Sequence, residues 1–329
     1  MKNRLLVVAV TIVVAVFMTF LIVKLMPGDP VHVLANELRT TQGISEEQAV
    51  KRAITMLNYD PNKTIVEQMV QFVKGLVTGD LGTSIRFKTP VVNIIKAALP
   101  WTLFSAGLAT ILSYFVGTKM GLYVAWKQDK KANAITDIVS SIFGSVPDYV
   151  IGFLLVSIFA VQMGLLPSRG AYSATVDPGF SFAFIGSVLT HAILPVLSLF
   201  IVQFANWIVN MRGSAANVMN QEYIKYARAR GLSNKVIRKQ YVGKNASLPM
   251  ITALGTTFGM LVGGAPLIEN VFSYPGVGFF LNTGVAVRDI PLMQGLFFMI
   301  IMTVIVCNFI VDLLYGYIDP RLRRSHGAK

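Results

Sequence analysis

The chain has 329 residues, of which 54% are apolar and only 14% are charged. A soluble domain carries about a quarter charged residues. The charges here are clustered, so several long apolar runs remain, and roughly 20 apolar residues in a helix cross a bilayer core about 30 Å thick. The composition therefore excludes an ordinary soluble protein and predicts an all-α polytopic membrane protein.

Two further properties of the composition narrow the class. The formal net charge of +13 would suit a nucleic-acid partner, but lysines and arginines gather in the cytoplasmic loops of membrane proteins. We therefore expect no nucleic acid. The single cysteine, Cys307, cannot form an internal disulfide, so no oxidised framework supports the outward-facing parts.

The first apolar run covers residues 5–23 and follows the basic residues Lys2 and Arg4. A signal peptide has a similar start. This run is longer than the apolar region of a signal peptide, however, and the sequence Lys24-Leu-Met-Pro-Gly-Asp-Pro follows it in place of a small-residue cleavage site. We expect a retained first transmembrane helix within residues 1–26.

A polar insert of mixed charge covers residues 27–99, and we interpret it as a small docked subdomain outside the cytoplasm. The sequence Ser45-Glu-Glu-Gln has the pattern of a capping box and predicts a helix start. Asp60-Pro is expected to close that helix. Residues 65–77 predict a second amphipathic helix that ends at Gly79.

Five further apolar runs follow the insert. We expect transmembrane helices over residues 103–126, 135–166, 184–211, 249–271 and 292–315. Pro147 predicts a kink in the second helix of this set, and Pro195 predicts a break in the third. Gly255, Gly259 and Gly263 form a small-residue stripe that would let two helices approach closely.

Residues 273–291 separate the last two of these runs and are mildly apolar. Their glycines and moderate apolarity suit irregular backbone that is buried in protein at membrane depth. We therefore expect this segment to dip back into the membrane as a re-entrant gate.

Six transmembrane helices would place both termini on the same side of the membrane. The short loops on that side carry nearly all of the lysines and arginines that short loops contain. Basic short loops stay in the cytoplasm. We therefore expect cytoplasmic N- and C-termini in a cell membrane, with the loop 213–248 on the same side.

The loop 213–248 has a regular architecture. Glu222 to Arg230 predicts a short helix, and Gly231 can adopt the left-handed conformation that ends it. Ser233 stands where an N-cap belongs, so residues 234–242 predict a second helix. Pro249 is then expected to open the next span at a first-turn position.

The first helix of this loop carries a stripe of Tyr223, Tyr226 and Ala227. A loop that only fixed orientation or touched anionic lipid would need positive charge but no helix–glycine–helix architecture. We interpret the loop as a rigid docking surface for a protein partner.

The sequence has no phosphate-binding loop, no nucleophile elbow and no His or Cys cluster with metal-ligand spacing. We expect no catalytic residue, no cofactor and no metal. Four charged residues lie in or near spans, which makes each a functional hypothesis: Lys119, Asp148, Glu269 and Asp312. The alternatives are that Lys119 snorkels to the surface and that Glu269 and Asp312 reach water.

The residues from Glu222 to Ser233, together with Lys244 to Pro249, resemble the EAA loop of binding-protein-dependent ABC importer permeases. The resemblance is to the oligopeptide, dipeptide and nickel branch. Family-like stretches also occur at residues 25–30, 79–84, 145–147, 269–278, 288–291 and 317–321. Within the loop, the acidic and alanine positions that give it its name are occupied by Lys225 and Tyr226, and only Ala227 fits.

This resemblance implies a non-enzymatic permease subunit whose core covers residues 100–329. It implies a second homologous permease subunit, two cytoplasmic ATP-binding subunits, an extracytoplasmic solute-binding protein and membrane lipid as partners. The implied coupling residues are Glu222, Tyr223, Tyr226, Ala227, Arg228, Arg230, Gly231, Leu232 and Pro249. The candidates for the pore or gate are Asp148, Glu269, Pro275, Gly276, Gly278 and Asp289.

The resemblance implies short peptides as the substrate class. The alternative within the same branch is nickel or a metal chelate. Two other classes remain open. An ion-coupled secondary carrier would usually show more buried carboxylates and inverted repeats, and no clear repeat is present. A membrane scaffold would not transport at all.

Overall fold

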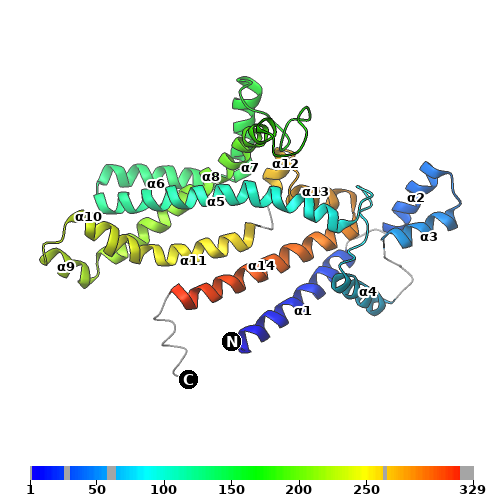
Figure 1. The fold of residues 1–329 in the computed structure, drawn as a ribbon, viewed down its shortest axis with the longest axis horizontal. Coiled ribbons are helices and arrows are strands. Elements are labelled where there is room, and N and C mark those ends of the chain that lie inside the picture. Colours follow the sequence, from blue (N-terminus) through cyan, green and yellow to red (C-terminus); the bar gives the residue numbers. More distant parts are fainter. Residues whose placement is uncertain (1, 26–29, 58–63, 262–264, 319–329) are drawn as a thin grey trace. The chain divides into compact units, whose positions relative to one another are not determined.

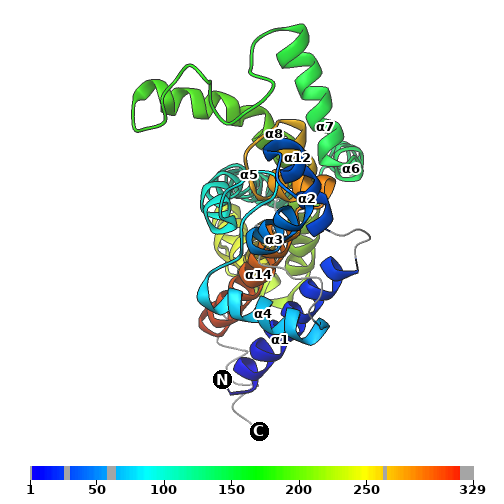
Figure 2. The same cartoon turned by 90° about the vertical axis from the view of Figure 1, so that its right-hand side faces the viewer.

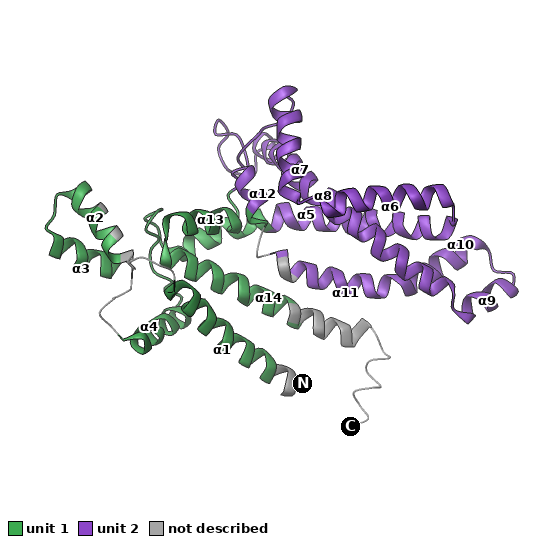
Figure 3. Ribbon diagram, turned by 180° about the vertical axis from the view of Figure 1, so that it is seen from behind, with its two compact units in different colours: residues 1–102, 262–266, 275–309 green, residues 103–261, 267–274, 310–329 purple. Residues whose placement is uncertain are grey.

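The computed structural model describes residues 2–25, 30–57, 64–261 and 265–318. Helices make up nearly all of the regular structure of these residues, and one isolated β-bridge pairs Thr83 with Pro90. The chain divides into two compact units, which are coloured separately in Figure 3. Each unit is described by itself.

Unit 1 contains residues 1–102, 262–266 and 275–309. Its helices are α1 (Lys2–Lys24), α2 (Pro30–Gln42), α3 (Glu46–Leu57), α4 (Ile65–Thr78), the start of α5 (Val91–Lys127), α13 (Val277–Val287) and most of α14 (Ile290–Ile318). Two buried clusters hold the unit together. One joins α2 to α3 through residues such as Leu34 and Ala53, and the other joins α5, α13 and α14 through residues such as Val91 and Leu296.

The insert contains the helices that the sequence predicts, with clear end signals. Ser45 Oγ accepts a hydrogen bond from the Gln48 N–H at the start of α3, at 3.3 Å. Thr64 and Glu67 form a reciprocal capping box at the start of α4, and Gly79 ends α4 in the left-handed conformation with φ 74°. The turn expected at Asp60 lies outside the described residues.

Unit 2 contains residues 103–261, 267–274 and 310–329. Its elements, besides the rest of α5, are α6 (Lys130–Ser145), α7 (Asp148–Leu155), the π-helix η1 (Val156–Gln162), α8 (Phe182–Met219), α9 (Glu222–Ala229), α10 (Asn234–Val236), the π-helix η2 (Ile237–Gly243), α11 (Lys244–Leu261) and α12 (Pro266–Val271). Helix α8 packs against α6, α7 and α11 (Figure 1).

Four described helices are long and apolar enough to cross a membrane, and the bent pair α6–α7 with η1 would make a fifth. The four are α1, α5, α8 and α14. The span expected at residues 249–271 is divided between α11 and α12, and residues 262–264 between them, which include Gly263 of the expected stripe, lie outside the described residues.

The prolines act differently from one another. At Pro147 the chain turns by 93° between α6 and α7, which confirms the kink. The break expected at Pro195 is wrong, because α8 continues through this residue. The helix that contains the span expected from residue 103 begins earlier, since α5 starts at Val91 and contains Pro100. A proline costs a helix one hydrogen bond, and α5 and α8 nevertheless continue through Pro100 and Pro195.

Candidate functional site

Helix α9 ends in a complete Schellman motif. The Leu232 N–H donates to the Ala227 carbonyl at 3.3 Å, and the Gly231 N–H donates to the Arg228 carbonyl at 2.9 Å. Gly231 has φ 74°, the left-handed conformation that this motif requires and that a side chain disfavours. The sequence-based prediction for Gly231 is therefore confirmed, and the direction in which the chain leaves α9 is fixed by two hydrogen bonds.

The inner face of α9 is buried against other helices of unit 2. Ile224 is 1% exposed and Ala227 is 3% exposed. Both belong to a buried cluster that also contains residues of α5, α8, η2 and α11, among them Trp207, Met211, Ile237 and Val242. Leu232, the residue after the turn, packs against the same cluster. Because of this packing, α9 cannot shift without disturbing the ends of these helices.

The stripe predicted on α9 divides between two faces. Ala227 points inward, whereas Tyr223 is 40% exposed and Tyr226 is 69% exposed. The prediction of one common stripe is wrong because Ile224, and not a tyrosine, pairs with Ala227 on the buried side. The tyrosines instead lie on the exposed side of α9, where Tyr226 is the more open of the two.

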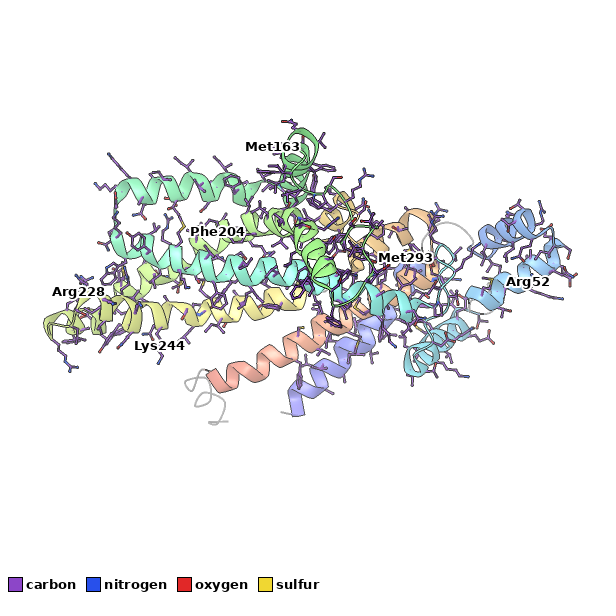
Figure 4. All side chains as sticks on the ribbon, turned by 45° about the horizontal axis from the view of Figure 1, so that its top comes forward. Arg52, Met163, Phe204, Arg228, Lys244 and Met293 are labelled. Carbon is purple, nitrogen blue, oxygen red and sulfur yellow. The ribbon has the colours of Figure 1, made fainter. Side chains whose placement is uncertain are left out.

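Charged side chains surround these two tyrosines. Lys225 donates from Nζ to Glu222 Oε1 at 2.8 Å, in a pair that is largely exposed. The Arg228 guanidinium lies 6.0 Å from the centre of the Trp126 ring, within cation–π range. Arg230 is exposed. Figure 4 labels Arg228 on α9 and Lys244 at the start of α11, at the same end of the unit.

The segment after Gly231 is helical, as predicted, but it continues further. Ser233 occupies the N-cap position of α10, with extended backbone and no side-chain capping bond. The turns of α10, η2 and α11 then follow one another without a gap up to Leu261. Pro249 therefore lies inside α11, and the expectation that it opens a helix at its first turn is wrong. The π-helical turns of η2 shift the register of the helix before Pro249.

A close approach of α5 and α8 supports this end of the unit, and sequence reasoning missed it. A Cβ added at Gly117 would lie 2.6 Å from Trp207 Cβ, and one added at Gly121 would lie 2.6 Å from the Ile208 carbonyl oxygen. The signal was present as a small-xxx-small pattern at residues 117–121. Ser214 adds a hydrogen bond from its hydroxyl to the Ala246 carbonyl at 2.9 Å, which joins α8 to α11.

Asp289, in unit 1, is fully buried and connects two distant stretches of sequence. Its carboxylate accepts hydrogen bonds from Ser84 Oγ at 2.5 Å, from the Arg86 N–H at 3.0 Å and from the Leu292 N–H at 3.2 Å. The last of these bonds caps the start of α14. Asp289 thus fastens the loop at residues 83–90 to the junction of α13 and α14.

The segment expected to form an irregular gate is mostly a helix, so that expectation is wrong as to its backbone. Helix α13 begins after Pro275 and Gly276, and the Val277 N–H donates to Thr102 Oγ1 at 2.8 Å. A Cβ added at Gly278 would lie 2.5 Å from Pro266 Cα. The glycines of this segment therefore allow close packing, and they do not break the helix.

The two remaining carboxylate candidates lie in unit 2. Glu269, on α12, is 2% exposed, so the alternative that it reaches water is wrong. Asp148 is half-buried in the first turn of α7 and accepts a hydrogen bond from the Tyr149 N–H at 2.8 Å, as suits a carboxylate at a helix N-terminus. The side chain of Asp312 lies outside the described part of the chain.

The long apolar helices define an all-α, multi-pass membrane protein. The chain belongs to the family described as the binding-protein-dependent transport system inner membrane component, whose model matches residues 117–324. The matched region contains all of the loop around α9.

Individual relatives extend the similarity over almost the whole chain. A protein described as a probable peptide ABC transporter permease from Sinorhizobium fredii is 31% identical and covers 96% of each chain. The dipeptide transport system permease protein DppB of Escherichia coli is 30% identical over 94% of each chain. The dipeptide permease DppB of Alkalihalophilus pseudofirmus is 29% identical over 98% of each chain.

A solved structure shows the same fold. The inward-facing MetNI methionine ABC transporter contains a chain that matches this one with a TM-score of 0.51 and 16% identity. The match covers 69% of this chain and 96% of the other. At this level of identity the match shows the fold alone.

Proposed function

We propose that this chain is a permease subunit of an ATP-driven ABC importer for short peptides, and that α9 is the helix through which the ATP-binding subunits act. The observation that carries this proposal is the contrast between the two faces of α9. Its inner face is packed into the cluster that joins α5, α8 and α11, while its outer face exposes Tyr223 and Tyr226. A partner that grips the outer face can therefore move the helices behind it.

The subunit itself is not an enzyme, and ATP hydrolysis takes place in its partners. Two ATP-binding subunits, a second homologous permease and an extracytoplasmic solute-binding protein complete the importer. The peptide and dipeptide permeases among the relatives support the substrate class. We infer six transmembrane helices, with α6 and α7 forming one bent span, so that both termini and α9 share one side, and the basic short loops favour the cytoplasm for that side.

The mechanism is alternating access. A partner can shift an equilibrium between two pore states only by binding one of them more tightly. ATP-bound and ATP-free subunits must therefore grip α9 differently. Since the Schellman motif and the buried Ile224 hold α9 firmly, its displacement is transmitted to the pore helices as a rigid movement.

We assign the gate to the segment of α13 in unit 1, with the Pro275–Gly278 turn as its moving part. Helix α13 is too short to cross a bilayer, which suits a re-entrant element. Each within its own unit, Asp148 and Asp289 have structural roles, as a helix-start carboxylate and as a buried connector.

The test is uptake by proteoliposomes that contain the complete transporter with its binding protein. Labelled di- and tripeptides are compared with a labelled nickel chelate, with ATP supplied on the side of α9. The proposal predicts peptide uptake that needs hydrolysable ATP. Uptake of the chelate alone would establish the metal branch, and uptake driven by an ion gradient without ATP would contradict the ABC mechanism.

A further inference from the structure

Helix α4 buries two residues that are not large and apolar, packs Phe72 toward α1 and exposes a row of valines. Gln68 is 5% exposed and Gly75 is buried. The outward residues are four valines, Val66, Val70, Val73 and Val77, which are 73%, 62%, 40% and 82% exposed. An apolar face that points away from its own unit marks a surface that something else covers.

The valines form one narrow stripe. Successive residues of an α-helix are about 100° apart, so the four valines fall within about 60° of one another. Gln68 and Gly75 lie on the opposite side of the helix. Glu67 and Lys74 border the stripe on one edge, and a groove along that edge is lined by Val66, Val70 and Lys74. The stripe is thus an apolar surface with a charged margin, as in helices that lie in a membrane surface.

The contacts of α4 fix where this surface lies. Lys24, in the last turn of α1, donates from Nζ to Gln68 Oε1 at 2.8 Å. The ring of Phe20, one turn deeper in α1, lies 6.0 Å from the ring of Phe72. Helix α4 therefore lies beside the last turn of α1 and crosses it (Figure 2). Its valine stripe, on the face opposite these contacts, points sideways from α1.

The neighbouring surface identifies the occupant. Helix α1 has the length and apolarity of a membrane span, and only 17% of its apolar window is buried within the structure. Ile22 and Leu25, near its Lys24 end, are 57% and 72% exposed. The valine stripe continues this lipid-facing surface at the level of Lys24, where a lysine reaches the headgroups. An amphipathic helix that crosses the end of a span suits the orientation of a helix in the membrane surface.

We propose that α4 is an in-plane membrane helix that lies in the lipid interface at the Lys24 end of α1. Its valine stripe contacts acyl chains, and Lys74 at its margin contacts lipid phosphates. In this position α4 fixes the depth of the insert relative to the bilayer. The inference rests on α1 being a span and does not depend on which substrate the transporter carries.

The test uses spin labels on the complete transporter in lipid nanodiscs, after Cys307→Ser. Single cysteines replace Val66, Val70, Val73 and Val77 in turn, and Glu67, Lys74 and Thr78 serve as matched positions on the same helix. Power saturation measures collisions of each label with oxygen, which is concentrated in lipid, and with a water-soluble nickel chelate. All seven side chains are exposed, so labelling leaves the folded core intact; the label at Glu67 also removes the capping bond at the start of α4, and its result is therefore read together with that at Thr78.

We expect the depth parameter to shift from water-like at Glu67 and Thr78 to lipid-like at the four valines. The shift should recur with the helical period along α4. Valine labels that collide mainly with the nickel chelate would show a water-facing helix and overturn the proposal. Valine labels protected from both reagents would show a protein partner on the stripe, and would overturn it equally.

Discussion

The α9 loop and the Asp289 junction both come from stretches that resemble the same family, yet the two regions have opposite construction. Asp289 is fully buried, and three donors within its own unit satisfy its carboxylate. Helix α9 packs only its inner face against its own unit and leaves Tyr223 and Tyr226 exposed. Family motifs therefore mark two kinds of residue. One kind holds the subunit together, and the other is available to a partner.

The largest effect on folding is expected at Asp289. Asp289→Ala leaves Ser84 Oγ and the N–H groups of Arg86 and Leu292 without their acceptor, at about 1–3 kcal/mol for each buried group. We expect a large fall in the melting temperature of the detergent-solubilised protein. The melting temperature of Asp289→Asn, which keeps one acceptor oxygen, should fall less. An unchanged melting temperature for Asp289→Ala would contradict the structural role that we give to Asp289.

Gly278→Ala is expected to have the second-largest effect on folding. The new Cβ would meet the backbone of Pro266 at 2.5 Å, and backbone cannot move aside as the end of a side chain can. Overpacking of this kind costs roughly 1–3 kcal/mol, and this contact belongs at the upper end. Gly213→Ala is the matched control, since a Cβ there meets nothing within 4 Å. Equal melting temperatures for the two variants would contradict the packing role of Gly278.

A smaller effect is expected at Gly231. A Cβ at this position meets nothing within 4 Å, so only the backbone conformation opposes a side chain. Gly231→Val should cost about 1–2 kcal/mol and change the exit angle of α9, whereas Gly231→Asn tolerates the left-handed conformation. In the valine variant, the ATPase activity should no longer respond to the binding protein. In the asparagine variant, the response should be normal. Normal coupling and uptake in both would show that the turn does not set the geometry of α9.

The smallest effect on folding is expected at Tyr226. Its side chain is 69% exposed, so Tyr226→Ala should change stability by less than about 0.5 kcal/mol. Peptide uptake should nevertheless fall strongly, because the partner loses its aromatic contact. A matching loss of stability and uptake would mean that Tyr226 belongs to the structural class, like Asp289.

Much of this arrangement could be predicted from the sequence where the determining interactions are local. The end of α9 at Gly231, the helix starts at Ser45 and Ser233 and the kink at Pro147 depend on residues a few positions apart. The loop around α9 could therefore be located from its own residues.

Other features depend on residues far apart in the chain, and no local pattern contains them. The burial of Asp289 depends on Ser84, and the helical state of α13 depends on its packing near Pro266. The inward direction of Ala227 depends on Ile237 and Trp207. For the same reason, the continuation of α8 through Pro195 could not be anticipated from the proline alone.

We propose that the outer face of α9 binds an ATP-binding subunit while its inner face holds the permease together. The most direct measurement is the amount of ATP-binding subunit that co-purifies with each permease variant from solubilised membranes. The double variant Tyr223→Ala with Tyr226→Ala is compared with Tyr123→Ala, a tyrosine of the same unit that is 52% exposed and lies outside α9.

The double variant should remain folded and lose the ATP-binding subunit, whereas Tyr123→Ala should retain it. A folded double variant that still binds the ATP-binding subunit in full amount would contradict the claim.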